Sequence, residues 1–241
     1  MIEIRSLSHR FADGTKGLED ISLTIRPGEF VVIAGCNGSG KTTLFRHLNG
    51  LLKPDAGDIL IDGVPVAADI LRARQKVGLV FQDADSQIVG ETVYADVAFG
   101  PENLCLSPNE IRRRVTIALN LVGLEHLADQ RPHRLSGGEK RRLAIAGILA
   151  MESPILVLDE PFSNLDYPGI LQVQSCIANL HAQGRTIILS THDLDKVAGY
   201  ASRLILMRQG RVIQDGPLEA LLQNVEAAGV KMPCRCVMKR R

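Results

Sequence analysis

Hydrophobic and polar positions alternate at the start of the chain, and further on they give way to unbroken apolar runs. Residues 2–11 and 21–25 alternate loosely, which predicts two half-exposed strands. Later runs are short and almost wholly apolar, as expected of strands buried on both faces; these are 30–34, 76–81, 155–158 and 185–191. The pattern predicts an α/β fold in which an N-terminal antiparallel β subdomain lies beside a core with a mostly parallel sheet.

Apolar residues three or four positions apart predict helices between these strands. Ser107, Pro108 and Glu110 have the spacing of a capped helix start, and Gly123 ends the same helix. No strand-like run occurs from about 90 to 135, so we expect a helical subdomain, about 90–150, inserted in the core. Further helices are predicted at 167–184 and about 217–224, and a hairpin at 203–215.

A glycine-rich stretch after the first buried run has the pattern G-x-x-x-x-G-K-T of a phosphate-binding loop. Unpaired amides at the start of the following helix, together with the helix dipole, favour bound phosphate. Lys41 supplies a positive charge and the Thr42 hydroxyl a ligand for Mg²⁺. The sequence therefore predicts a nucleoside triphosphate site formed by Gly35, Cys36, Asn37, Gly38, Ser39, Gly40, Lys41, Thr42 and Thr43.

Polar residues follow three of the buried runs. Asp159 and Glu160 end the run at 155–158, where an aspartate is the usual Mg²⁺ partner and a glutamate can polarise a water for attack on phosphorus. His192 follows another run and either contacts the outer phosphate or simply ends its strand. Gln82 ends a third run and by itself indicates little.

Residues 136–139 read Ser-Gly-Gly-Glu and open a helix over 140–151. Two glycines behind a capping serine make a second potential anion site, although a well-capped helix is the alternative. Phe11 is one of nine aromatic residues and lies upstream of the phosphate loop. An adenine ring could stack on it, or it could belong to the core.

Composition and charge narrow the class of protein. A chain of 241 residues suits one large domain. Its net charge is +1, and five of its basic residues lie in 231–241, so the rest of the chain carries a net negative charge. We therefore expect no nucleic-acid partner. Five cysteines without a regular spacing indicate a reducing compartment. We expect no signal peptide, since the chain starts as a strand. No apolar run approaches the about 20 residues needed to span a bilayer.

Taken together, the motifs resemble the ATP-binding cassette ATPases over nearly the whole chain, to about residue 224. Residues 35–42 look like Walker A, 135–139 like the family signature, 155–160 like Walker B, and 163–166 like the D-loop. Gln82 matches the Q-loop, His192 the switch histidine, and Phe11 the adenine-stacking aromatic. The signature ends in Glu139 where the family often has glutamine, and Cys36 lies at a variable position.

The resemblance implies an ATP hydrolase that uses ATP and Mg²⁺. Its catalytic residues would be Glu160, His192 and Gln82, and its metal ligands Thr42, Gln82 and, through water, Asp159. In the family, the signature of one subunit closes over the nucleotide of another, so Ser136, Gly137 and Gly138 would serve the partner's site. The expected partner is a second copy of this chain or a homologous ATPase.

Within the family, residues 81–100 and 143–151 are similar to the energy-coupling-factor ATPases of cobalt, nickel, biotin and other vitamin uptake. This resemblance implies a peripheral subunit at the cytoplasmic face of the membrane. It would bind an integral coupling component and a substrate-binding membrane component. We expect 83–100 to contact the coupling component through a polar start, including Gln87, and an apolar run at 93–99; the alternative is that this run packs inside the helical subdomain.

Other functions remain to be weighed. A non-transport cassette protein would usually carry a coiled-coil insert or tandem cassettes, and neither is present. A conventional importer or exporter ATPase remains an alternative that 81–100 disfavours. A purely regulatory module should lack Glu160 or His192. We expect one domain over 1–224 and a basic, flexible tail over 225–241, in which Cys234 and Cys236 are too few to hold a structural zinc.

Overall fold

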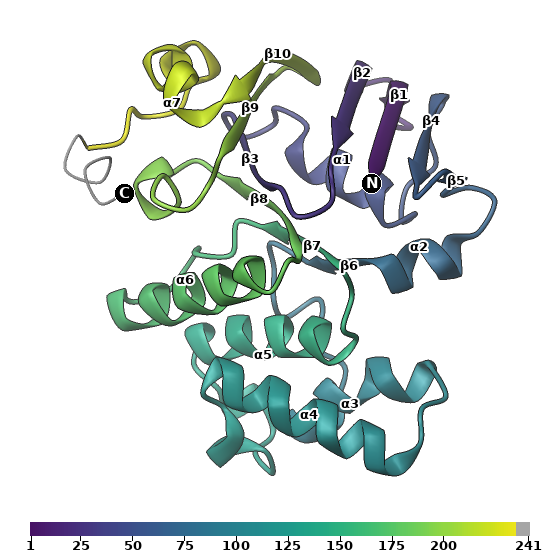
Figure 1. Cartoon of the computed structure of the whole chain (residues 1–241), viewed down its shortest axis with the longest axis vertical. Coiled ribbons are helices and arrows are strands. Elements are labelled where there is room, and N and C mark those ends of the chain that lie inside the picture. The colour runs from purple at the N-terminus through teal and green to yellow at the C-terminus, as the bar shows by residue number, and fades with distance from the viewer. Residues whose placement is uncertain (235–241) are drawn as a thin grey trace.

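Two sheets and a lobe of helices make up the computed structural model, which describes residues 1–234 (Figure 1). The smaller sheet is antiparallel throughout, with the strand order β2-β1-β4-β5. Its strands are β1 (Ile2–Arg10), β2 (Lys16–Ile25), β4 (Ala56–Ile61) and β5 (Val64–Pro65). The predicted N-terminal antiparallel subdomain is confirmed.

The larger sheet has the order β10-β9-β3-β8-β7-β6, and only β10 runs antiparallel to its neighbour. Its strands are β3 (Phe30–Ala34), β6 (Val77–Val80), β7 (Ile155–Asp159), β8 (Thr186–Thr191), β9 (Arg203–Arg208) and β10 (Arg211–Pro217). Because β3, β7 and β8 are parallel neighbours, their carboxyl ends meet at one edge of the sheet, where ligands bind in α/β folds.

The unbroken apolar runs have a simple cause. Alternate side chains of β3 enter different hydrophobic clusters: Phe30 and Val32 join one, and Val31 and Ile33 join the other. The first cluster extends into the helical lobe, and the second lies between the two sheets. With a core on each face, the middle positions of the central strands are apolar, and polar side chains such as Asp159 and Ser190 occur only toward the strand ends.

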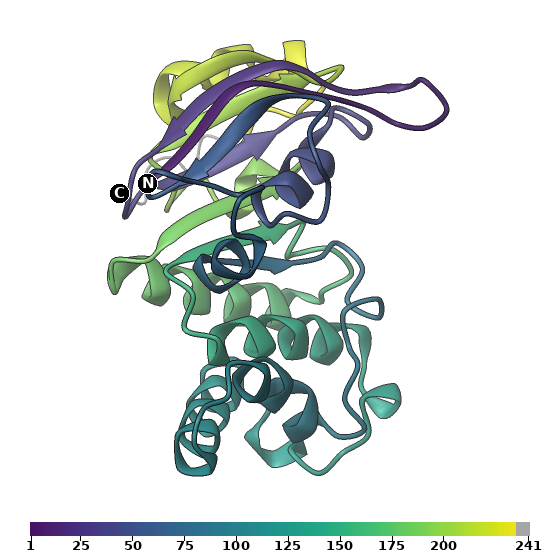
Figure 2. The ribbon, with the colours of Figure 1, turned by 90° about the vertical axis from the view of Figure 1, so that its right-hand side faces the viewer.

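Helices surround the larger sheet and form a separate lobe at one end of the molecule, which is elongated (Figure 2). Outside the lobe lie α1 (Lys41–Leu48), α2 (Ile70–Lys76), α6 (Tyr167–Ala182), α7 (Leu218–Leu221) and the 3-10 helices η3 (Leu194–Lys196) and η4 (Leu222–Ala228). The lobe holds α3 (Val93–Asn103), α4 (Pro108–Val122), η1 (Glu125–Leu127), η2 (Pro132–Arg134) and α5 (Gly137–Ala150).

The helix caps read from the sequence are present in the lobe. The Ser107 side chain accepts a hydrogen bond from the Glu110 amide, and Gly123 ends α4 in the left-handed conformation, with φ of 68°. By contrast, α2 was not predicted, since it is short and only Ala73 of it is buried. Without a buried stripe, no hydrophobic periodicity marks such a helix.

The packed region continues beyond residue 224, where we expected a flexible tail to begin. Val225, Ala228 and Val230 are buried in the cluster of the larger sheet. The Ala228 carbonyl also accepts a hydrogen bond from the Cys36 amide at 3.0 Å. The expectation therefore placed the boundary too early; the rest of the expected basic tail, with Cys236, lies outside the described residues.

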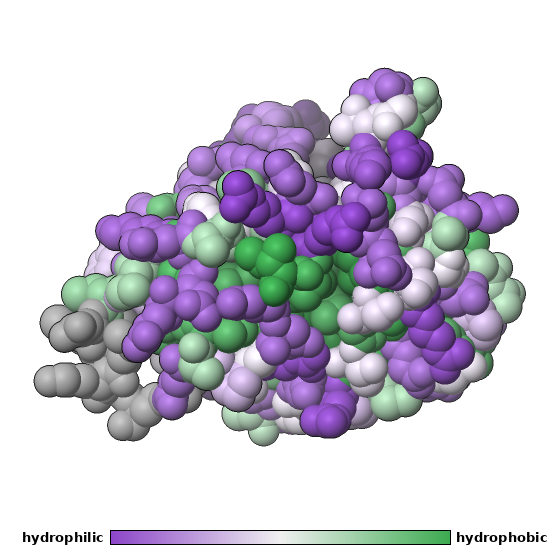
Figure 3. Space-filling model, turned by 90° about the horizontal axis from the view of Figure 1, so that it is seen from above, coloured by the Kyte–Doolittle hydropathy of each residue, from purple (hydrophilic) through white to green (hydrophobic). Residues whose placement is uncertain are grey.

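Seen from the side of β10 and β2, the surface has an apolar centre enclosed by polar residues (Figure 3). β10 is the edge strand here: Val212 is partly buried against the cluster between the sheets, and Ile213 is exposed.

No helix within residues 1–234 is both long and apolar enough to cross a membrane.

Candidate active site

The phosphate loop, residues 35–40, runs from the end of β3 into the start of α1 and depends on its glycines. A Cβ on Gly35 would lie 2.3 Å from the Met207 carbonyl oxygen, and one on Gly40 would lie 2.8 Å from the Gly17 carbonyl oxygen. Gly38 and Gly40 also have φ of 77° and 103°, which favour glycine. Gly40 precedes α1 without a side-chain cap, so the first amides of this helix point into the cleft unblocked by a cap.

Lys41 is held against the loop. Its Nζ donates to the carbonyl oxygens of Gly35 at 2.8 Å and Cys36 at 3.1 Å. Burial lowers the pKa of Lys41, whereas the nearby Glu160 and Asp159 carboxylates act in the opposite direction. The lysine thus brings a buried positive charge to the floor of the cleft, where phosphate would replace these carbonyl partners.

Cys36 is placed differently from our expectation. Its amide donates to the Ala228 carbonyl at 3.0 Å, and its Cβ lies 3.2 Å from the position of a Cβ on Gly229. The amide is therefore not free for phosphate, and Cys36 contributes its carbonyl to Lys41 instead. The segment after η4 thus supports the back of the phosphate loop.

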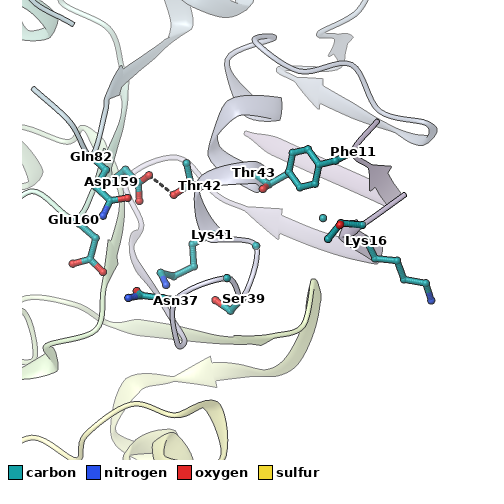
Figure 4. Close-up of a pocket in the computed structure, with 14 residues that line it drawn as sticks. Phe11, Lys16, Asn37, Ser39, Lys41, Thr42, Thr43, Gln82, Asp159 and Glu160 are labelled. Atoms are coloured by element: carbon teal, nitrogen blue, oxygen red, sulfur yellow. Dashed lines mark hydrogen bonds between the residues drawn. The ribbon is translucent and has the colours of Figure 1, made fainter. Parts of the chain in front are cut away.

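Three oxygen-bearing side chains meet at the carboxyl ends of the strands. Asp159 accepts from the Thr42 hydroxyl at 2.6 Å with one oxygen (Figure 4). Its other oxygen accepts from the Ser190 hydroxyl at 2.5 Å. Hydroxyl and carboxylate oxygens are the donors that Mg²⁺ prefers. Ser190, fully buried at the end region of β8, was missed in the sequence; a single serine after three aliphatic residues was its only signal.

Glu160 directly follows β7 and has φ of 48°, a conformation uncommon for a residue other than glycine. Ser190 holds this turn as well, since its hydroxyl oxygen accepts from the Glu160 amide at 2.9 Å. The Glu160 carboxylate lies 3.0 Å from Nδ1 of His192. The structure thus brings together the proposed base and the histidine, one buried and the other largely exposed.

A hairpin supplies the outer wall of the cleft. β1 and β2 form a long projecting hairpin (Figure 2), and Phe11 lies in its turn. The Phe11 ring packs edge-on against His9, with centroids 5.0 Å apart, and Gly17 leaves room for it. Phe11, 40% exposed, is therefore available for stacking rather than buried in the core.

A cleft of about 400 Å³ joins these parts (Figure 4). Phe11 and Lys16 lie on one side, Lys41 and Asn37 lie in the middle, and Gln82, Asp159 and Glu160 lie on the other side. Thr15, Lys16 and Gly17 were missed in the sequence, although a basic, glycine-bounded turn is a usable signal. The cleft is lined by Phe11, Thr15, Lys16, Gly17, Asn37, Gly38, Ser39, Gly40, Lys41, Thr42, Thr43, Gln82, Asp159 and Glu160.

The Gln82 loop, residues 81–90, connects β6 with the helical lobe. Gln82 is exposed and lines the cleft, whereas the side chain of Gln87 is half-buried and bonds to the backbone of its own chain. Its side chain accepts from the Phe81 amide at 2.9 Å and donates to the Leu79 carbonyl at 3.4 Å. Asp96 of α3 holds the far end through the Val89 and Gly90 amides.

The apolar run at 93–99 was expected on the surface, and most of it is not. Val93 and Val97 are fully buried in the hydrophobic cluster of the lobe, where α3 packs against α5. Phe99 and, just before the run, Val89 are 53% and 62% exposed. The alternative of inward packing therefore holds for the two valines, and Phe99 is the one large apolar side chain of the run that is exposed.

The signature segment, residues 135–139, begins α5 in the helical lobe. The Ser136 hydroxyl accepts from the Glu139 amide, and the Glu139 carboxylate accepts from the Ser136 amide at 2.7 Å, which makes a capping box. These bonds lower the pKa of Glu139. Among the described residues, those that line the cleft do not include Ser136, Gly137 or Gly138. The structure does not bring this segment to the chain's own phosphate loop.

Comparison with known proteins agrees with this geometry. The sequence profile of the ABC transporter family matches residues 18–163. The energy-coupling factor transporter ATP-binding protein EcfA of Methanocaldococcus jannaschii is 43% identical over 239 residues, which cover 97% of this chain and 86% of that protein.

Solved structures are similar over most of the chain. One is cbiO1 from Clostridium perfringens, described as part of the ABC transporter complex cbiONQ, with 41% identity, a TM-score of 0.82 and coverage of 94% and 92% of the two chains. Another is the ATP-binding cassette MJ0796, a dimer in a post-hydrolysis state with ADP and Pi, with 29% identity, a TM-score of 0.83 and coverage of 90% and 99%.

Proposed function

The chain belongs to the ABC transporter family of ATPases, and we propose that it drives an energy-coupling-factor type importer of a micronutrient. It hydrolyses ATP with Mg²⁺, and its relatives include ATP-binding subunits of energy-coupling-factor transporters. The substrate class we propose is a cobalt or nickel ion or a vitamin such as biotin. One relative is part of the cbiONQ complex, and residues 81–100 resemble the ATPases of such importers.

One observation carries the proposal of a hydrolytic rather than a purely binding site: the Glu160 carboxylate lines the same cleft as Lys41 and Thr42. It is buried, hydrogen-bonded to His192, and free to accept a proton from water beside the outer phosphate. A regulatory module would need the phosphate loop but not this pair.

The residues divide the work between binding and chemistry. Lys41 and the amides of the phosphate loop hold the phosphates, and Phe11 stacks on the adenine ring. Thr42, Asp159 and Gln82 fit Mg²⁺, because the first two already form a bonded pair of oxygen donors and the third reaches the same cleft. Bound there, the ion neutralises charge on the phosphates. His192 holds the Glu160 carboxylate in place, and Glu160 takes the proton of the attacking water.

We propose that two chains form each complete site. The signature segment does not line the chain's own cleft, so its helix start with two glycines would contact the phosphates of a nucleotide bound to another chain. The similar cassette MJ0796 forms a dimer with ADP and Pi. ATP would therefore close two copies, or this chain and a homologous ATPase, with Ser136, Gly137 and Gly138 on the partner's nucleotide.

We further propose that Val89 and Phe99 contact an integral coupling component at the cytoplasmic face of the membrane, beside a substrate-binding component. Both side chains are exposed. Val89 belongs to the Gln82 loop and Phe99 to α3, and Asp96 of α3 joins the two segments by accepting from the Val89 and Gly90 amides. Phe99→Arg should leave basal ATP hydrolysis unchanged and abolish copurification with the membrane component. A complex recovered in wild-type yield would remove this surface from the interface.

Replacement of Glu160 tests the catalytic proposal. Glu160→Gln should retain ATP binding and lower the hydrolysis rate about 100-fold or more, since it removes a base but no phosphate ligand. Glu125→Gln is the control, because Glu125 is an exposed carboxylate in η1. ATP affinity and single-turnover hydrolysis would be measured on both chains. Wild-type turnover in Glu160→Gln would refute the role given to Glu160.

A further inference from the structure

Arg141 is a buried cation in α5 that touches the Gln82 loop rather than the cleft. Only 3% of the residue is exposed. One terminal nitrogen donates to the Phe81 carbonyl at 2.5 Å, and the other donates to the Gln82 carbonyl. The guanidinium therefore holds two consecutive peptide groups, one of them belonging to the glutamine that lines the ATP cleft.

Packing alone does not account for a charged residue here. Burial of a cation costs several kcal/mol, which an ion pair of good geometry partly offsets. Within the described residues, Arg141 forms no ion pair, and its Nε has no hydrogen-bond partner. Burial lowers its pKa, and the more distant carboxylates of Asp159, Asp83 and Glu160 oppose that shift. A methionine would fill similar space without the cost of a buried charge.

A neighbouring contact strengthens the link between α5 and the loop. Lys140 binds Asp85 through an ion pair of 2.6 Å. Adjacent residues of one helix thus hold the loop at 81–82 and at 85. Gly137 and Gly138 lie about one helical turn before these two residues, so the contacts are made close to the start of α5.

We propose that Arg141 is a positioning residue that makes the orientation of the signature segment depend on Gln82 of the same chain. Movement of Gln82 toward bound nucleotide would carry the Phe81 and Gln82 carbonyls, and through Arg141 the start of α5. The inference rests on the proposed function, in which that segment serves the partner's ATP. Each chain would then report the state of its own site to the opposite site.

The experiment isolates this link inside one chain. Gly137→Glu is used as background, because nothing lies within 4 Å of a Cβ at Gly137 and the acidic side chain would obstruct a partner's phosphates. Amide hydrogen exchange is followed in peptides covering 81–90 and 139–146, with and without Mg-ATP. In the parent chain both peptides should respond to nucleotide.

With Arg141→Met added, 81–90 should still respond while the response of 139–146 falls about 2- to 30-fold, the range expected for loss of a coupling contact. Arg141→Lys, which can reach one carbonyl, should retain part of it. Arg185→Met is the matched control, because Arg185 also donates to a backbone carbonyl, that of Ser153 at 2.7 Å, but precedes β8 at the opposite end from the cleft. It should behave as the parent.

In the chain with Gly137 intact, the Hill coefficient for ATP hydrolysis should fall toward about 1 in Arg141→Met. A response of 139–146 that persists in both Arg141 variants would overturn the proposal, as would its absence from the parent. ATP affinity is measured on the same samples: chains that bind no ATP would contradict the proposed function, whereas normal binding with unchanged coupling contradicts only the role of Arg141. Thermal unfolding shows whether Arg141→Met is folded. If it is not, the test rests on Arg141→Lys, in which the response of 139–146 should be reduced.

Discussion

Two helices of this molecule, α1 and α5, have glycines at their starts, and they differ in how the neighbouring side chains treat the free amides. α1 follows Gly40 with no side-chain cap and no acidic residue in its first turn, and Lys41 brings a positive charge. α5 starts at Gly137 behind a complete capping box, and Glu139 places a negative charge in its first turn. The first helix leaves its amides open to an anion within the chain. The capping box of the second helix already pairs its amides with side chains of the same segment, so a phosphate would have to compete with these bonds.

The same substitution should lower ATP affinity at the start of α1 and leave it unchanged at the start of α5. Gly40→Ala forces a left-handed φ on alanine and sets its Cβ 2.8 Å from the Gly17 carbonyl oxygen. Such strain costs about 1–3 kcal/mol, which predicts a loss of ATP affinity of about 10- to 100-fold. Gly137→Ala meets no atom within 4 Å and should keep wild-type affinity. Calorimetric titration with ATP measures the affinity of both variants. Equal affinities would contradict the difference described between the two helix starts.

Blocking the start of α5 should separate binding from assembly. Gly137→Glu leaves the capping box in place and the chain's own cleft untouched, so ATP affinity of the monomer should stay unchanged. In the slowly hydrolysing Glu160→Gln background, Mg-ATP should no longer produce a dimer. Sedimentation velocity with and without Mg-ATP measures this. Dimers formed as readily as with Gly137 intact would show that α5 does not receive the partner's nucleotide.

The smallest expected effect concerns the carboxylate of Glu139, which also accepts from the Ser136 hydroxyl at 2.8 Å. Glu139→Gln retains an acceptor for the Ser136 amide and removes a charge that repels phosphate. We expect ATP-driven dimer affinity to rise about 2- to 5-fold, consistent with a charge interaction of about 1 kcal/mol or less in water.

The pH dependence of that effect follows from the lowered pKa of Glu139. Because this pKa is lowered, the carboxylate is ionised in the folded chain throughout the neutral and mildly acidic range, so the difference between Glu139→Gln and wild type should be constant there. At a more acidic pH, below the ordinary range of a glutamate, protonation removes the same charge from wild type and the difference should close. Sedimentation equilibrium across this range tests the sign; a dimer weakened by Glu139→Gln at pH 7 would contradict the account.

Much of the site could be predicted because its parts are contiguous. The phosphate loop, the carboxylates at 159–160 and the cap at Ser107 each occupy a few successive residues beside an apolar run, and local backbone geometry decides what they do. For the same reason the order of strands and helices follows from hydrophobic periodicity, since the central strands of the larger sheet bury both faces.

Residues that act across the fold escaped the sequence. Ser190 holds Asp159 and Glu160 only because β7 and β8 are parallel neighbours. Arg141 reaches the Gln82 loop over a separation of 59 residues, and Ala228 supports Cys36 from the far end of the chain.

Direction of burial was equally a matter of tertiary packing. Val93 and Val97 have the same apolar character as Phe99, yet the valines enter the lobe and the phenylalanine faces solvent. Periodicity says which side chains share a face of a helix but not whether that face meets another helix or a partner protein. Local chemistry therefore follows from the order of residues along the chain, whereas the contacts that align the catalytic groups, and the surfaces left for other molecules, arise only when distant segments pack together.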